Sequence, residues 1–288
     1  MNLILRTLTG IAIVAVIAGC ILGGFYWSMG LFGILTLAST LEFVNICRKE
    51  ASASVWSVVP ALLSYLTAIW LFCDLSGNEH SAGKRAIMVA FSLFILSSLI
   101  LLACELYRLK TRPVINLSVG LMPILYIALP FSLVPILGLW CGAQTGAAYN
   151  GLFPLALFVF VWCNDVGAYC VGCTLGRHRL FPRVSPKKSW EGSAGGAILT
   201  IAAAIVMARA MPEHFGFMPA SSWAVIALLT VVFGTLGDLT ESLIKRGLDI
   251  KDSGRILPGH GGFLDRFDST LFVVPAVAAF LLLRSLSC

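Results

Sequence analysis

The sequence predicts an all-α polytopic membrane protein, on the evidence of its composition, its long apolar runs and the placement of its basic residues. Hydrophobic residues make up 58% of the 288 residues, charged residues only 12%, and the mean hydropathy is +0.92. A soluble domain carries about 25% charged residues. Because an α-helix of about 20 apolar residues crosses a bilayer, we expect about nine spans. They lie approximately at 3–23, 25–46, 52–73, 86–104, 114–137, 150–172, 193–211, 222–240 and 269–284.

The Lys and Arg residues predict how these spans are oriented, because cytoplasmic loops carry an excess of them. With the N-terminus in the cytoplasm, the inner loops 173–192 and 241–268 contain five Lys or Arg residues each. The outer side then keeps only Lys84, Arg85, Arg209 and Arg284 of the 20. We therefore expect a cytoplasmic N-terminus and a C-terminus on the opposite face.

The two halves of the chain differ in their loops. Residues 1–149 have short connections and are expected to be a transmembrane scaffold, whereas residues 150–288 have long, basic, Gly-rich inner loops and are expected to form the catalytic region. Gly192 and Gly196 have the small-xxx-small spacing that lets helices approach closely.

The first polar constellation interrupts the apolar run 150–172. Asn164 and Asp165 lie within it, and Tyr169, four residues after Asp165, shares its helix face. Ionisable residues inside a span are costly and usually functional. Asp165 either pairs with a basic residue of a neighbouring helix, or it lines with Asn164 and Tyr169 a cavity for substrate or ions.

The segment from Ser185 to Gly192 predicts a phosphate site. Ser185 or Ser189 is placed to cap the following helix, and Lys187 and Lys188 stand beside the helix N-terminus, whose free N–H groups attract phosphate. A general contact with anionic lipid is the alternative.

A polar stripe is predicted at the end of the run 222–240. If that helix continues, Asp238, Glu241, Ser242 and Lys245 lie at i, i+3, i+4 and i+7 and share one face. Arg246 follows directly. The alternative is that the stripe only joins two helices through ion pairs.

A Gly-rich turn and two further carboxylates follow the stripe. The glycines around His260, including Gly261 and Gly262, allow positive φ and an anion-binding nest of N–H groups. Asp265 and Asp268 lie at i and i+3 on the first turn of the last span. Carboxylates from two helices beside Lys and Arg suit Mg²⁺ with phosphate oxygens completing its shell.

These residues carry a family resemblance. The run from Ser242 to Asp268, with Lys245-Arg246, Lys251-Asp252 and the His260-Gly261-Gly262 turn, resembles the signature of the phosphatidate cytidylyltransferases, or CDP-diacylglycerol synthases. The segments Ser185–Gly192 and Asp165–Tyr169 are also similar to that family, with Ser189 where Thr is more usual. The resemblance is specific from about Asn164 to Ser269.

The resemblance implies a multi-helix, dimeric enzyme of a bacterial inner membrane whose active site faces the cytoplasm. It would convert CTP and phosphatidic acid to CDP-diacylglycerol and pyrophosphate in phospholipid biosynthesis. Asp238 and Asp265 match the acidic residues that hold the metal centre, with Mg²⁺ and K⁺ as candidate ions. CTP, phosphatidic acid, the bilayer and a second copy are thus the expected partners, and nucleic acid is not.

The remaining roles are hypotheses on that basis. Lys245, Arg246 and Arg266 would offset phosphate charge, and Asp268 would orient groups or bind metal. Lys187 and Lys188 would hold either the CTP phosphates or the lipid head group. His260 would hydrogen-bond phosphate or shape the turn. The other expected substrate-binding residues are Asn164, Asp165, Tyr169, Ser185, Glu241, Ser242, Gly261 and Gly262.

Other functions predict different features. A CTP-dependent polyprenol or phytol kinase would share acidic and Gly-rich loops, and a cation transporter could place Asp165, Asp238 and Asp265 along an ion path. A transporter does not need phosphate-type basic loops. A CDP-alcohol phosphotransferase would carry a D-G-x2-A-R type motif, which this sequence lacks.

Overall fold

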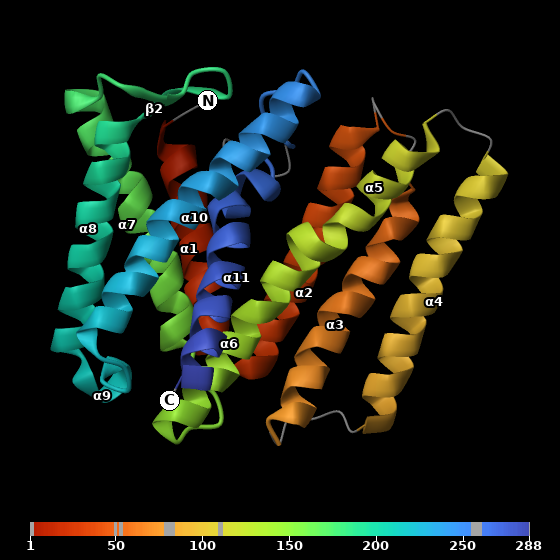
Figure 1. Cartoon of the computed structure of the whole chain (residues 1–288), viewed down its shortest axis with the longest axis horizontal. Coiled ribbons are helices and arrows are strands. Elements are labelled where there is room, and N and C mark those ends of the chain that lie inside the picture. Colours follow the sequence, from red (N-terminus) through yellow and green to blue (C-terminus); the bar gives the residue numbers. More distant parts are fainter. Residues whose placement is uncertain are drawn as a thin grey trace.

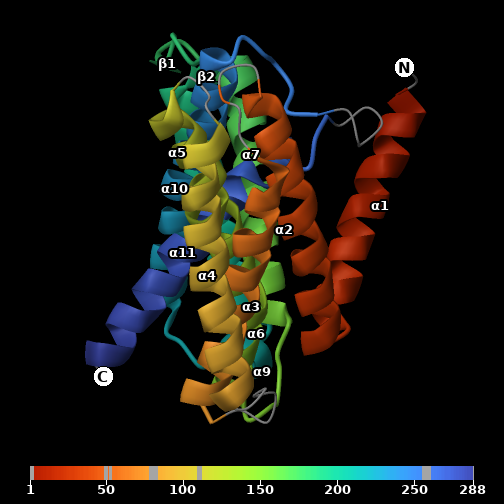
Figure 2. The same ribbon diagram turned by 90° about the vertical axis from the view of Figure 1, so that its right-hand side faces the viewer.

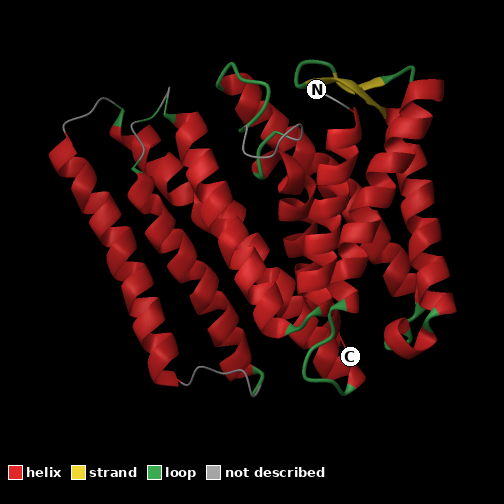
Figure 3. Cartoon of the chain, turned by 180° about the vertical axis from the view of Figure 1, so that it is seen from behind, coloured by secondary structure: helices red, strands yellow, loops and turns green. Residues whose placement is uncertain are grey.

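A computed structural model describes residues 3–48, 51, 54–77, 84–108, 112–254 and 261–287, and this part is almost entirely helical (Figure 3). Its elements are α1 (Leu3–Leu22), α2 (Phe25–Cys47), the 3₁₀ turn η1 (Val55–Ser57), α3 (Val58–Leu75), α4 (Lys84–Arg108), α5 (Pro113–Pro123), the π-helical turn η2 (Ile124–Ala128), α6 (Leu129–Thr145), α7 (Leu152–Leu175), β1 (Arg179–Phe181), β2 (Ser185–Ser189), α8 (Trp190–Ala210), α9 (Pro212–Phe215), α10 (Ala220–Gly247) and α11 (Leu264–Ser287).

The all-α polytopic class is confirmed. Eight helical stretches of the described residues are long and apolar enough to cross a membrane, with α5, η2 and α6 forming one of them. α1 corresponds to the first expected span, and its stretch Thr7–Leu22 is an apolar helix. The number of crossings and the cytoplasmic side stay predictions.

The helices at the C-terminal end of the chain are packed around α10. α10 contacts α8 on one side and α11 on the other, and α7 packs along α8 (Figure 1). On the other side of α11, α6 leads to α2 and α3, and α4 lies outermost (Figure 1). α1 contacts α2 and α7 and leans away from the bundle towards its own N-terminal end (Figure 2).

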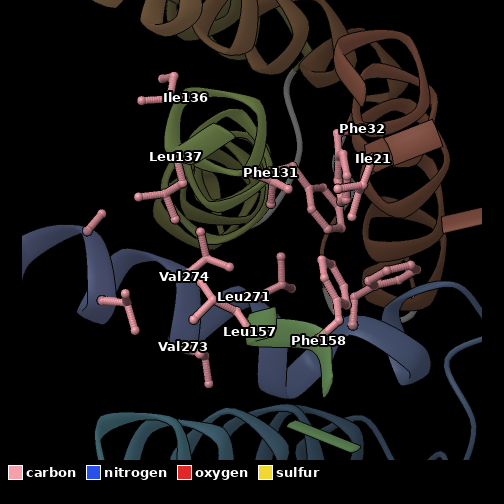
Figure 4. Close-up of a cluster of buried hydrophobic side chains, with 14 of the residues drawn as sticks. Ile21, Phe32, Phe131, Ile136, Leu137, Leu157, Phe158, Leu271, Val273 and Val274 are labelled. Carbon is pink, nitrogen blue, oxygen red and sulfur yellow. The ribbon is translucent and has the colours of Figure 1, made fainter. Parts of the chain in front are cut away.

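An aromatic core joins the first part of the chain to the last. The ring centroid of Phe131 of α6 lies 5.7 Å from that of Phe32 of α2 and 5.5 Å from that of Phe267 of α11. Phe158 of α7 completes the group, and aliphatic side chains of α11 such as Leu271 and Val274 lie beside it (Figure 4). Buried aromatic pairs of this kind contribute more than their area alone. The core therefore holds α11 in register against three other helices.

Two helix boundaries differ from the apolar runs. α10 continues past residue 240 to Gly247, so the polar stripe lies on one continuous helix, and α11 begins at Leu264 rather than at 269. Hydropathy marks the part of a helix that suits lipid, and it does not register polar turns that extend beyond. The loop 173–192, predicted to lie on the inner side, also contains an antiparallel hairpin of β1 and β2 with an irregular register.

Close contact between α7 and α8 depends on glycines of both helices. A Cβ atom on Gly167 would lie 2.8 Å from the carbonyl oxygen of Gly195 and 2.9 Å from the Cα of Gly196. The close approach expected for Gly192 and Gly196 is thus made within the chain, against α7.

We expect Gly167→Val to destabilise the protein by about 1–3 kcal/mol, because overpacking must force α7 and α8 apart. The measurement is the thermal midpoint of the detergent-purified protein. Gly30→Ala is the control, since a Cβ there meets nothing within 4 Å. An unchanged midpoint in Gly167→Val would contradict the packing described here.

Candidate active site

The predicted site residues gather at the end of the bundle where α10 ends and the β1–β2 hairpin lies (Figure 1). Lys245 of α10 is the centre of one group. Its Nζ lies 2.7 Å from Oε2 of Glu241 and 2.7 Å from Oδ1 of Asp265, which belongs to α11. The side chains are 13%, 1% and 7% exposed respectively. This buried pairing joins α10 to α11, as the ion-pair alternative predicted for the stripe.

Asp265 also orders the Gly-rich turn. Its Oδ2 accepts the N–H of Ser253 at 2.9 Å and that of Gly262 at 3.0 Å. Gly261 has the expected positive φ, 79°. The Gly262 N–H is therefore engaged by Asp265 in this structure, whereas the sequence predicted it to face phosphate. His260 lies outside the described residues.

A second ion pair connects the hairpin to α10. Lys188 Nζ of β2 lies 2.5 Å from Oδ2 of Asp238, and the Ser242 hydroxyl donates to Oδ1 of Asp238 at 3.2 Å. The Lys188 and Asp238 side chains are 25% and 36% exposed, so an anion from solution can reach this pair far more easily than the Lys245 group. Ser189, and not Ser185, caps α8, because its Oγ accepts the Gly192 N–H at 3.1 Å.

Three carboxylates from three helices lie close enough near this pair to interact electrostatically. Asp165 of α7, Asp238 of α10 and Asp268 of α11 each repel the other two electrostatically. Lys188 and Arg266 offset the charge of Asp165. The structure therefore places Asp165 among the predicted catalytic residues.

Two pockets share Asp165. One, of about 300 Å³, lies between α7, β2, α8 and α10, and the other, of about 250 Å³, lies between α1, α7 and α11. The first is lined, among others, by Asn164, Asp165, Tyr169, Lys187, Lys188 and Asp238. The second is lined, among others, by Gly10, Ile13, Val14, Asp165, Asp265, Arg266 and Asp268.

Some predicted residues lie apart from these pockets. The Arg246 guanidinium donates to the carbonyl of Ile250 at 3.4 Å on the exposed side of α10, and Ser185 begins β2 without lining either pocket. Asn164 lines the first pocket but is buried, and its Oδ1 faces Gly196 of α8.

Sequence reasoning missed Glu42 of α2. Its carboxylate accepts the hydroxyl of Ser253 and, at 2.8 Å, the N–H of Phe263. The available signal was a lone acidic residue within the apolar run 25–46. Nothing in the sequence indicates that its partners follow more than 200 positions later.

The expected metal ligands stay a prediction. Among the described residues, no set of three or more His, Cys, Asp or Glu side chains is arranged to hold a metal ion. Asp238 and Asp265 each contact a lysine instead. A metal at either carboxylate must therefore compete with an ammonium group.

The fold and the site together define a polytopic membrane protein with a carboxylate- and lysine-lined site at one end of its helix bundle. The sequence profile of the cytidylyltransferase family matches residues 4–284, and the chain belongs to this family. The match extends through the first 150 residues, where the sequence had shown no specific resemblance.

Several curated proteins named phosphatidate cytidylyltransferase are similar to this chain. One from Staphylococcus epidermidis is 32% identical over 273 residues, which is 94% of this chain and 95% of that protein. One from Haemophilus influenzae is 31% identical over 284 residues, covering 96% and 97% of the two chains. One from Bacillus subtilis is 48% identical over 119 residues, which is 41% of this chain and 42% of that protein.

We expect Lys245→Met to destabilise the protein by about 3–5 kcal/mol, because it leaves the buried carboxylates of Glu241 and Asp265 without their shared cation. Arg246→Met is the matched control, one position along on the exposed side, and we expect its thermal midpoint to stay near wild type. Equal midpoints for both variants would show that the Lys245 pairs do not stabilise the fold.

Proposed function

We propose that the protein transfers the cytidylyl group of CTP to phosphatidic acid and releases pyrophosphate. The observation that carries the proposal is the pair of pockets that meet at Asp165, one lined by Lys187 and Lys188 beside the exposed hairpin, the other lined by apolar residues of α1 together with Arg266 and three aspartates. A reaction between a water-soluble nucleotide and a membrane lipid needs one access route for each substrate, and both routes must lead to the same reaction site. The similarity to phosphatidate cytidylyltransferases along the whole chain supports the same reaction.

The pockets suggest how the substrates divide. Lys187 and Lys188 in the pocket between α7, β2, α8 and α10 suit the CTP phosphates, since this pocket lies beside the exposed hairpin. The pocket between α1, α7 and α11 offers Ile13 and Val14 to an acyl chain and Arg266 to the lipid phosphate. Sequence reasoning had left open which substrate the two lysines bind.

The residues then have defined tasks in the transfer. A phosphate oxygen of phosphatidate attacks the α-phosphorus of CTP, a new P–O bond forms, and the bond to the β-phosphate oxygen breaks to release pyrophosphate. Phosphatidate is already an anion near pH 7, so no general base is required. Lys187, Lys188 and Arg266 orient the two substrates and offset their charge, which is the main contribution a protein makes to phosphoryl transfer.

The residues present fit Mg²⁺. Asp165, Asp238 and Asp268 supply carboxylate oxygens close enough to repel one another, and Oε1 of Glu241, in the neighbouring Lys245 group, is buried without a hydrogen-bond partner among the described residues. Mg²⁺ prefers one or two carboxylates together with substrate phosphates. The family resemblance makes Asp238 and Asp265 its proposed ligands, with K⁺ as a further candidate ion, and Asp265 would have to exchange its contact with Lys245 for the metal. A bound Mg²⁺ would neutralise phosphate charge.

The setting completes the proposal. Both pockets lie near the hairpin end of the bundle, which is the end that the positive-inside rule assigns to the cytoplasm, where CTP is available. A bacterial inner membrane and a homodimer are the expected environment and assembly.

We expect purified protein supplied with Mg²⁺, phosphatidate and CTP labelled at the α-phosphate to give a labelled lipid and unlabelled pyrophosphate. Thin-layer chromatography of the lipid phase is the measurement. Label that reaches the lipid only from γ-labelled CTP would instead indicate a lipid kinase. Failure to produce either lipid would favour transport.

We expect Asp238→Asn and Asp265→Asn each to lower turnover about 1,000-fold, because an amide neither binds Mg²⁺ nor balances the lysines well. Asp249→Asn is the control, since this exposed residue lies outside both pockets and its positive φ of 52° suits Asn. EDTA should stop wild-type turnover and added Mg²⁺ should restore it. Persistent turnover in EDTA would refute the metal assignment.

A further inference from the structure

A buried carboxylate in the first part of the chain contacts the loop that carries the predicted site residues. Glu42 lies in the last turns of α2 and is only 4% exposed. Oε1 accepts the hydroxyl of Ser253, and Oε2 accepts the N–H of Phe263 at 2.8 Å. Burying a carboxylate among apolar helices is costly unless such donors satisfy it. The Glu42 carboxylate is therefore stabilised in its buried position by these two donors.

Glu42 and Asp265 together bind both ends of one loop, and we refer to these two residues as the carboxylate clamp. Where the loop leaves α10, Ser253 donates its hydroxyl to Glu42 and its N–H to Asp265. Where the loop returns, Gly262 donates its N–H to Asp265 and Phe263 donates its N–H to Glu42. Each end of the loop is thus held by both acids.

The backbone packs directly against the Glu42 carboxylate. A Cβ atom on Gly254 would lie 3.1 Å from Glu42 Cδ, and a Cβ atom on Gly262 would overlap Oε1 of Glu42. Glycine is required at 262 for this approach, because any side chain would displace the loop from the clamp. The positions of Glu42 and the loop are therefore mutually determined.

The clamp also fixes where α11 starts. Glu42 accepts the N–H of Phe263, the residue before the first turn of α11, and interacts with the N–H of Leu264. A negative charge at a helix N-terminus is favourable. The same first turn carries Asp265 and Arg266, which line the pocket between α1, α7 and α11. A shift of this turn would move both groups.

We propose that Glu42 is a positioning residue for cytidylyl transfer. It holds the first turn of α11 so that Asp265 and Arg266 keep their places, and it contacts no substrate itself. This inference rests on the proposed function.

The test compares Glu42→Gln with Ser39→Ala, which lies one turn earlier on α2 and removes a buried hydroxyl that has no partner among the described residues. We expect kcat of Glu42→Gln to fall about 100-fold, because displacement of a catalytic group by about 1 Å has that effect. The KM for CTP should change less than about threefold, since the lysine-lined pocket is untouched. Ser39→Ala should match wild type in both.

A second readout does not depend on activity. In amide hydrogen exchange, Ser253, Gly262 and Phe263 should exchange faster in Glu42→Gln than in wild type or Ser39→Ala, because the clamp opens more often. In addition, Ser253→Ala combined with Glu42→Gln should lose little more activity than Glu42→Gln alone, since both changes remove one contact.

Wild-type kcat and wild-type exchange in Glu42→Gln would overturn the proposal, as would fully additive losses in the double variant. If Glu42→Gln fails to fold, Ser253→Ala alone decides, because wild-type kcat and exchange in that variant also refute the clamp. A wild-type protein that makes no CMP-bearing lipid would refute the proposed function, whereas the exchange measurement would still test the clamp.

Discussion

The site depends on one ammonium group placed between two buried carboxylates. Lys245 joins Glu241, on its own helix, to Asp265 on α11, and all three side chains are largely withdrawn from solvent. Because an isolated buried charge is strongly destabilising, this arrangement stabilises the contact between α10 and α11. The second oxygen of Asp265 is then free to bind the backbone at Ser253 and Gly262. The Gly-rich turn is therefore ordered by Asp265, whose charge is neutralised by Lys245.

Lys188 and Lys245 both pair with carboxylates, but only the Lys188 pair is open to replacement of its carboxylate by another anion. The Lys188–Asp238 pair is partly exposed and lines a pocket, so an arriving phosphate can contact the lysine in place of the carboxylate. The Lys245 group is enclosed, and the same exchange there would require the helices to separate. The Lys188 and Lys245 ion pairs are thus similar in length but differ in their access to solvent. The catalytic role of Lys245 stays a prediction, and in the structure its ammonium group pairs with Glu241 and Asp265.

Much of the fold was accessible from the sequence because apolar length determines whether a helix suits a bilayer. The stripe on α10 was also predictable, since the spacing of Asp238, Glu241 and Lys245 depends only on helix geometry. The apolar runs alone did not give the helix ends, because hydropathy falls where polar turns such as those of Lys245 and Asp265 extend a helix beyond its apolar part. The Glu42 contacts were not either, as a single chain gives no sign of which distant donors a lone acid will meet. The short hairpin that contains Ser185 could not be predicted either, because its strands carry no alternating apolar pattern.

The reach of Glu42 along the chain has a consequence for biosynthesis. Its described partners are 211 and 221 residues away, so α2 enters the bilayer long before the ribosome has made the groups that satisfy its carboxylate. Until then, the Glu42 carboxylate must find its hydrogen-bonding partners in water or in the insertion machinery. The residues that satisfy Glu42 are therefore made almost last, and a chain truncated before α11 would leave its carboxylate without the N–H of Phe263.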